Sequence, residues 1–372
     1  MGIYFHIPYC SKACHYCDFH FSTDSSTLES MLDCMVKEVA MQKDFITQPI
    51  ETIYFGGGTP SLLSASQFKK LIAAVAENFQ QQNLEITVEC NPDDLSIQHL
   101  EDLKALGINR LSLGIQSLFD EELRSMNRSH SAKQALESMD MAREAGFTNI
   151  SVDIIFAIPG GSTSGVMESL QKLLEYRPEH FSAYSMTIEE KTVFGHRLKT
   201  GEILEVDDDI AAEQFQKIID HLIGAGYEQY EISNFSIPGF ESKHNSNYWK
   251  GIPYLGIGPG AHSYHGDYRQ FNVRNNRKYI KSLQNDILPF EREVLSNTQK
   301  INEFILTTLR TKWGCDTYVL KEKFGFDLYS SNKSYIDEMM ETEFLFMNNG
   351  ILYLTSKGKF LADLITEKLF QP

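Results

Sequence analysis

The stretch Ile3-Tyr4-Phe5-His6-Ile7-Pro8-Tyr9-Cys10-Ser11-Lys12-Ala13-Cys14-His15-Tyr16-Cys17 places three cysteines directly after a short β-like run. The chain has 372 residues and only six cysteines, too few for a disulfide scaffold at this length. A closed structural zinc site takes four ligands, so three thiolates on one loop leave a metal position open. Thiolates also suit iron–sulfur clusters. Cys10, Cys14 and Cys17 are therefore predicted to hold a [4Fe-4S] cluster with one iron open to another ligand.

A zinc site is the alternative interpretation of the same loop. His15 or His20 would then supply the fourth ligand. No second CxxC or HxxxH pair follows along the chain, which favours the iron–sulfur interpretation.

Short β-like runs alternate with amphipathic segments through the first two-thirds of the chain. The runs are 3–5, 52–55, 84–90, 110–116, 150–158 and 181–187. Ser26 and Glu29 form a capping-box pattern before the first amphipathic segment. This alternation predicts an α/β fold with a parallel sheet, and six units are too few for an eight-fold barrel. We therefore predict an open or partial (β/α)6 barrel with its ligand site at the carboxyl ends of the strands.

The candidate motifs lie where such a site requires them. The cysteines follow the first run and Gly56-Gly57-Gly58-Thr59-Pro60 follows the second, while Glu89, Gln116 and Asp153 lie on the next three. Because parallel strands end at one edge of a sheet, these groups are predicted to converge on one mouth.

The pattern of predicted helices and strands changes from about residue 296. Two helical segments precede a hairpin pattern with a turn at Asn348-Asn349-Gly350, and a last helix follows. This pattern predicts a small winged-helix-like α+β domain. Residues 296–372 carry nine Lys and Arg against ten Asp and Glu, so the domain lacks the basic face of a DNA-binding module and is interpreted as a packing or docking unit.

Composition excludes several classes of function. The net charge of −16 repels phosphate backbones, so nucleic acid is not expected as a partner. No apolar stretch approaches the ~20 residues of a membrane-spanning helix, and the first residues lack a signal-peptide pattern. A cytoplasmic protein is expected, as a monomer or homodimer. Cys34, Cys90 and Cys315 are expected to fill the core.

Five ordered motifs carry a resemblance to a known family. Cys-x3-Cys-x2-Cys with an aromatic residue before the last cysteine resembles the radical S-adenosylmethionine (SAM) superfamily signature. The wider set is similar to the oxygen-independent coproporphyrinogen III oxidase family and covers most of the chain. Its members are Tyr4–Cys10, Gly56–Pro60, Glu89-Cys90-Asn91-Pro92, Arg110–Gln116 and Asp153-Ile154-Ile155.

The resemblance implies a cofactor pair and a set of binding residues. SAM would chelate the open iron, and the reduced cluster would cleave it to methionine and a 5′-deoxyadenosyl radical. The glycines would let backbone approach the methionine end of SAM, Glu89 would accept from its ammonium group, Arg128 would bind its carboxylate and Asp153 its ribose hydroxyls. The implied SAM-binding residues are Tyr4, Gly57, Gly58, Thr59, Glu89, Gln116, Arg128 and Asp153. At Ala157–Ser162 the chain departs from the pattern of its relatives, so contacts on the adenine side are expected to differ in detail.

Two local features separate the subgroups of this family. Decarboxylating members carry a further cysteine where this chain has Phe19, and members with Phe resemble the HemW group of heme chaperones. His244-Asn245-x-x-Tyr248-Trp249 is similar to the HNxxYW motif of that group. An imidazole can ligate heme iron and aromatic rings offer flat apolar surface, so His244 is the predicted heme ligand, with His262 and His265 as second choices.

Two functions follow from the resemblance. In the first, the protein binds a [4Fe-4S] cluster, SAM and heme, and delivers heme to an acceptor hemoprotein. In the second, it is an enzyme that decarboxylates the propionates of coproporphyrinogen III, and would need cations such as Lys243, Arg269, Arg274 and Arg277 around its substrate. The expected division is a radical SAM core at 1–235, an extension at 236–295 that carries HNxxYW and a glycine-rich loop at 256–263, and the C-terminal domain at 296–372.

Overall fold

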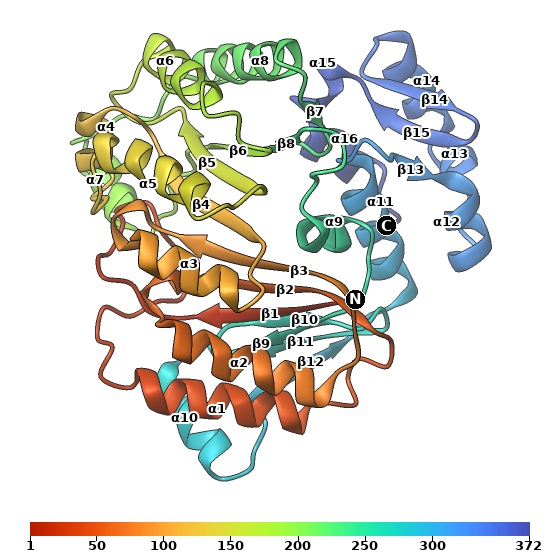
Figure 1. Cartoon of the computed structure of the whole chain (residues 1–372). Coiled ribbons are helices and arrows are strands. Elements are labelled where there is room, and N and C mark those ends of the chain that lie inside the picture. The colour runs from red at the N-terminus through yellow and green to blue at the C-terminus, as the bar shows by residue number, and fades with distance from the viewer.

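Six parallel strands form the centre of the fold in the computed structural model, which describes residues 1–372 (Figure 1). They are β1 (Gly2–Ile7), β2 (Ile50–Gly57), β3 (Gln81–Cys90), β4 (Arg110–Gln116), β5 (Ile150–Phe156) and β6 (His180–Ser185). Each pairs in parallel with the next along the chain, which confirms the predicted partial (β/α)6 barrel. The last two strands end earlier than predicted, and Ala157 takes a positive φ of 55° directly after β5.

Amphipathic helices cover the outer face of these strands, as Figure 1 shows for α1, α2 and α3. The helices of this region are α1 (Leu28–Met41), α2 (Ala65–Asn78), α3 (Ile97–Ala105), α4 (Asp120–Ser125), α5 (Ala132–Glu144), α6 (Thr163–Leu174), α7 (Val193–Lys199) and α8 (Asp208–Gly224), with short 3-10 turns at Pro60–Leu62 and Pro92–Asp94. The capping box predicted at Ser26 is wrong. The residue before α1 is Thr27, and its side chain makes no capping bond. The Ser26 N–H, which a capping box would pair with Glu29, bonds the Asp24 carboxylate instead.

The strands alternate between an apolar outer face and a polar inner face. Ile3, Phe5 and Ile7 of β1 are fully buried in the main hydrophobic core. The residues between them, Tyr4 and His6, line a cavity instead. The same alternation places Ser112 and Gly114 of β4, and Asp153 of β5, on the cavity wall. The concave side of the sheet is thus a binding surface and the convex side is the core.

Antiparallel strands extend the sheet at both edges. On one side β9 (Tyr254–Ile257) pairs in parallel with β1, and β10 (His262–Tyr264), β11 (Tyr268–Asn272) and β12 (Phe290–Val294) follow antiparallel; on the other, β8 (Asn234–Ser236) and β7 (Glu228–Gln229) follow β6. Two helices belong to this region, α9 (Lys243–Trp249) and α10 (Asn276–Gln284). Residues 254–294 therefore continue the central sheet.

The C-terminal residues have a hydrophobic core of their own, from Ile301 to Leu369, and a three-stranded antiparallel sheet. Their elements are α11 (Asn297–Leu309), β13 (Cys315–Asp316), α12 (Thr317–Phe324), α13 (Leu328–Ser331), α14 (Lys333–Glu341), β14 (Leu345–Asn348), β15 (Ile351–Leu354), α15 (Ser356–Lys359) and α16 (Ala362–Lys368). Four helices precede the hairpin where two were predicted, because Gly325 ends α12 in a left-handed conformation and Asp327 caps a new helix. These residues thus pack around a hydrophobic core distinct from that of the central sheet, and the division at residue 296 stays a prediction.

The turn predicted at Asn348-Asn349-Gly350 is a two-residue loop, because Asn348 ends β14; Asn349 and Gly350 both have positive φ, as such a loop requires. None of the helices in this fold has the length and apolar character needed to cross a bilayer.

Candidate functional site

A cavity of about 860 Å³ opens beside the carboxyl ends of the central strands and extends along their concave face. All of the residues predicted for the cluster and for SAM line it: Tyr4, Cys10, Cys14, Cys17, Gly57, Gly58, Thr59, Glu89, Gln116, Arg128 and Asp153. The predicted convergence of strand ends on one mouth is therefore what the structure shows. Among the predicted heme ligands, His262 lines the cavity, whereas His244 and His265 do not.

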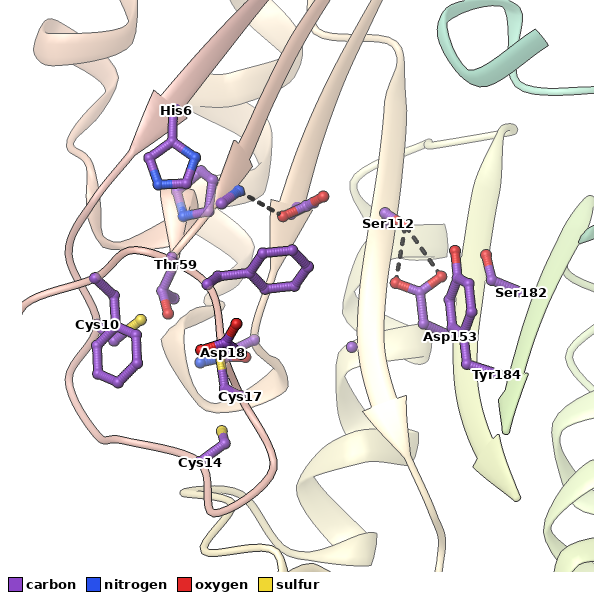
Figure 2. Close-up of a pocket in the computed structure, with 18 of the residues that line it drawn as sticks. His6, Cys10, Cys14, Cys17, Asp18, Thr59, Ser112, Asp153, Ser182 and Tyr184 are labelled. Carbon is purple, nitrogen blue, oxygen red and sulfur yellow. Dashed lines mark hydrogen bonds between the residues drawn. The ribbon is translucent and has the colours of Figure 1, made fainter. Parts of the chain in front are cut away.

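The three clustered cysteines lie on the loop that follows β1, and all three are unpaired and half-buried (Figure 2). The Cys14 Sγ accepts from the Arg128 guanidinium at 3.5 Å. No group of three or more His, Cys, Asp or Glu side chains is arranged around one point as a single metal ion requires. His15 is turned away, since its Nδ1 bonds the Ser125 carbonyl and its ring packs on Phe194. The zinc alternative thus gains no support. In a [4Fe-4S] cluster each thiolate binds a different iron, so the three sulfur atoms lie farther apart than they do around one metal ion.

The glycines at 56–58 are required by contacts inside the protein. A Cβ on Gly57 would lie 2.4 Å from the His6 ring, and Gly57 has a φ of +105°. A Cβ on Gly58 would lie 2.6 Å from the Tyr9 carbonyl oxygen. These residues let β1 and β2 approach closely at their ends, a reason that the sequence interpretation, which considered only SAM, did not include.

Glu89 is a half-buried residue at the end of β3. It accepts from the Tyr54 hydroxyl at 2.9 Å and from the Gly57 N–H at 3.0 Å. Burial raises the pKa of Glu89 to about 7, with a smaller contribution from the Asp153 carboxylate. A ligand cation at this point would favour its ionised form.

Arg128 is held beside the cysteine loop with one donor unused. Its Nη2 donates to the Asn91 side chain at 2.7 Å and to the Gly114 carbonyl at 2.8 Å. Its Nε is buried and has no hydrogen-bond partner. Gln116 lies close by with a strained φ of +67°. An unsatisfied buried guanidinium donor suits a carboxylate ligand.

Asp153 is oriented by hydroxyl groups of the neighbouring strands. Ser112 Oγ donates to both carboxylate oxygens, at 3.3 and 3.0 Å, and Figure 2 shows Ser182 on the other side. Burial raises the pKa of Asp153, and bonds to Ser182 and Ser112 oppose that shift. The carboxylate is thus fixed against the cavity, where hydroxyl groups of a ligand can donate to it.

His244 lies behind the cavity wall rather than in it. Its Nδ1 bonds Thr52 Oγ1 and its Nε2 bonds the Tyr248 hydroxyl, both at 2.8 Å, and the residue is 2% exposed. Its ring stacks on Tyr54 with centroids 5.0 Å apart. Burial lowers the pKa of His244 to about 3, so the imidazole is neutral. In this arrangement no ring nitrogen is available to a heme iron, and the side chain positions Tyr248 in the wall.

Several lining residues had no motif to mark them. They are Tyr54, Ser182, Tyr184 and Tyr254. The signal was present as the period-2 alternation of polar and apolar residues along each strand, which assigns even-numbered positions of β1, β2 and β4 to the cavity. Of the four cations proposed from sequence, only Arg274 lines the cavity, and Arg269 is ion-paired with Glu303.

Comparisons with known proteins place this geometry in a family. The Radical SAM superfamily profile matches residues 4–173. Over 367 residues the chain is 35% identical to the heme chaperone HemW of Lactococcus lactis, covering 98% of this chain and 96% of that protein. HemW of Bacillus subtilis is also 35% identical, over 97% of this chain and 96% of its own length. The chain belongs to the HemW family of radical SAM proteins.

HemW-family similarity extends to animal proteins and to a solved structure. The mitochondrial radical S-adenosyl methionine domain-containing protein 1 of Danio rerio is 32% identical over 98% of this chain and 85% of its own length. The structure of coproporphyrinogen III oxidase (HemN) from Escherichia coli superposes with a TM-score of 0.86, covering 100% of this chain and 90% of that one. Its sequence identity is 22%, so the match establishes a common fold for HemN and this HemW-family chain.

Proposed function

We propose that this protein is a heme chaperone that binds a [4Fe-4S] cluster, SAM and heme, and delivers heme to acceptor hemoproteins. The observation that carries the proposal is full-length similarity at 35% identity to two bacterial proteins named heme chaperone HemW. Membership of the radical SAM superfamily implies the cluster and SAM. The acceptor, the location in the cytoplasm and the monomeric or homodimeric state stay predictions.

The residues of the cavity fit the cluster and SAM. Cys10, Cys14 and Cys17 would hold three irons, and the bound cluster supplies one-electron chemistry. Arg128 offers its unpartnered Nε to the SAM carboxylate. Glu89 offers an acceptor to the ammonium group, and Asp153, oriented by Ser112, accepts from ribose hydroxyls. Tyr4, Gln116 and Thr59 complete the proposed pocket.

The cavity also suits a large flat ligand. Its volume of about 860 Å³ lies in the upper part of the ~300–1,000 Å³ range of small-molecule sites, which leaves room for more than one ligand. Tyr54, Tyr184, Tyr248 and Tyr254 give its wall an aromatic character that suits a porphyrin.

The enzyme alternative rests on the HemN fold. Against it stands Phe19, which occupies the position where the resemblance puts a further cysteine in decarboxylating members. A porphyrinogen decarboxylation assay with reductant and SAM separates the two functions. Product formation at enzymatic rates would overturn the chaperone proposal.

Heme transfer tests the proposal directly. The full chain, reconstituted without oxygen, is loaded with heme and mixed with an apo-hemoprotein such as apomyoglobin. We expect the transfer rate to rise with acceptor concentration, as direct handover requires. A rate independent of acceptor concentration would reveal passive dissociation and contradict the chaperone function. The matched control is Cys315→Ser, which changes a buried cysteine far from the cavity.

A further inference from the structure

Three histidines line the cavity, and only one of them has no hydrogen bond at either ring nitrogen. His6 bonds the Tyr4 hydroxyl through Nδ1 at 3.1 Å and the His20 carbonyl through Nε2 at 2.8 Å. His20 bonds the Asn276 side chain through Nε2 at 2.7 Å. His262, on β10, is exposed to the cavity and bonds nothing through either ring nitrogen.

We propose that His262, and not His244, supplies the imidazole that ligates heme iron, at the part of the cavity wall formed by β10 and the loop before it. The inference rests on the proposed heme-binding function and names the ligand for it. His244 is excluded by its surroundings, since both of its nitrogens are hydrogen-bonded to side chains of the wall. Ligation through either nitrogen of His244 would break a hydrogen bond behind the cavity wall, whereas ligation by His262 breaks none.

The surroundings of His262 match the rest of a heme. Phe19, on the cysteine loop, lines the same cavity and is 70% exposed, so an aromatic face is available to the macrocycle. Arg274 also lines it and makes no ion pair; its guanidinium donates to the Asp18 carbonyl, which ties it to the Phe19 loop. Such a cation is complementary to a heme propionate.

Gly260, two residues before His262, lies between Arg274 and His20. A Cβ on Gly260 would lie 3.5 Å from side-chain atoms of both Arg274 and His20. Burial, with the positive charges of Arg269 and Arg274, lowers the pKa of His262, which keeps the imidazole in the neutral form that binds iron.

The backbone before His262 is held rigidly by a buried carboxylate. Glu38 of α1 accepts from the Gly258 N–H at 2.9 Å and from Asn272 Nδ2 at 2.7 Å. Asn272 also donates through Nδ2 to the Gly258 carbonyl and through its backbone N–H to the Ala261 carbonyl, each at 2.9 Å. A binding group on such a scaffold is already in position before its ligand arrives.

The test compares heme coordination in matched variants of the full, cluster-loaded chain. Heme is titrated in and its Soret band and electron paramagnetic resonance spectrum are recorded. We expect His262→Ala to lose the imidazole signature and to bind heme about tenfold or more weakly. His265→Ala is the control, because that ring stacks on Tyr268 outside the cavity. Free imidazole should restore the signature to His262→Ala.

Other outcomes overturn the inference in distinguishable ways. If His244→Gln loses the imidazole signature while His262→Ala keeps it, the ligand assignment is wrong and the heme-binding function stands. If the unchanged protein binds no heme, the proposed function fails together with the assignment. Cluster iron content and circular dichroism show that each variant is folded.

Heme dimethyl ester tests the contribution of Arg274 separately. Esterification removes the propionate charges, so Arg274→Gln should weaken binding of heme and leave binding of the ester unchanged. An equal loss for both ligands would show that Arg274 acts only by holding the Phe19 loop, and would remove it from the proposed site.

Discussion

Glu89 shows how a single residue can be tuned for a cationic ligand. Its carboxylate is half-buried and accepts only two hydrogen bonds, from Tyr54 and Gly57, which leaves acceptor capacity facing the cavity. Glu85, four residues earlier on β3, is buried; it accepts from the backbone of Lys243 and His244 and does not line the cavity. Glu89 is therefore available to a ligand, whereas Glu85 holds the backbone at the start of α9.

Glu89→Gln should weaken SAM binding by about tenfold, since a charge-assisted hydrogen bond contributes roughly 1.5–3 kcal/mol. The pKa of Glu89 is about 7, so its carboxylate is charged above that pH and neutral below it. The affinity advantage of the unchanged protein over Glu89→Gln should shrink as the pH falls from 8 to 6. Isothermal titration calorimetry with SAM at several pH values measures this difference in affinity. Glu85→Gln is the control, and an equal loss of affinity in that variant would contradict the assignment.

Gly350 is a residue whose replacement should be costly for two independent reasons. It has a φ of +78°, and a Cβ there would lie 2.1 Å from the Tyr318 ring. Gly325 has a similar φ of +72° with open space around it. Gly325→Ala should therefore lower the free energy of unfolding by about 1 kcal/mol, from strain alone. Gly350→Ala should lower the free energy of unfolding by more than Gly325→Ala does, as urea unfolding would measure. Equal losses in the two variants would show that the Tyr318 ring moves aside freely.

At the scale of elements, α1 and the loop before β10 are joined by a buried polar network. Glu38 is fully buried and accepts from Tyr279, Gly258, Asn272 and Gln42. Burial raises the pKa of Glu38 from 4.5 to about 7, against the effect of these donors. Such a network specifies one position of the loop at the expense of stability.

The raised pKa of Glu38 predicts a pH-dependent stability. Between about pH 4.5 and 7 the folded state keeps a proton that the unfolded chain has lost, so the Glu38 contribution to stability falls as the pH rises. Relative to Glu38→Gln, the free energy of unfolding of the unchanged protein should fall by about 3 kcal/mol between these pH values. Chemical unfolding at pH 5 and pH 8 measures the difference. Glu29 is exposed on the same helix, so Glu29→Gln should leave the pH dependence of the free energy of unfolding unchanged. The prediction would be contradicted if the unchanged protein and Glu38→Gln differed in stability by the same amount at pH 5 and pH 8.

At the scale of the whole molecule, two hydrophobic cores meet at an interface that combines ion pairs with aromatic and apolar contacts. Lys312 of the C-terminal part donates to Glu228 at 2.8 Å and to Glu241 at 2.6 Å, both in the extension of the central sheet. Trp313 beside it packs against Tyr230 and carries the Lys250 ammonium over its ring. Ion pairs beside α9 therefore act together with the apolar contacts of Phe360 and Ile232 in holding the C-terminal domain in place.

Lys312→Met should weaken that connection. The loss of two partly buried ion pairs should lower stability by about 0.5 to 1 kcal/mol and separate the unfolding of the two cores in calorimetry. Lys321→Met is the control, because Lys321 pairs with Asp327 inside the C-terminal domain. A single transition unchanged in Lys312→Met would show that apolar packing alone joins the cores.

The sequence by itself determined the features that depend on neighbouring residues. The six strands, the Asn349-Gly350 turn and the cysteine loop follow from alternation, turn chemistry and spacing, and strand ends brought the motifs to one mouth because parallel strands share an edge. The extra helices at 317–331 were missed, since short helices ended by Gly325 carry little periodic signal.

Only the tertiary structure decided which side chains are free to act. A motif marked His244, but its Nδ1 is bonded to Thr52, 192 positions away in the chain, and no local pattern encodes that contact. The same holds for the unused Nε of Arg128 and the free ring of His262. Hydrogen-bonding capacity is allocated by contacts between distant segments, so availability for a ligand is a property of the packed molecule.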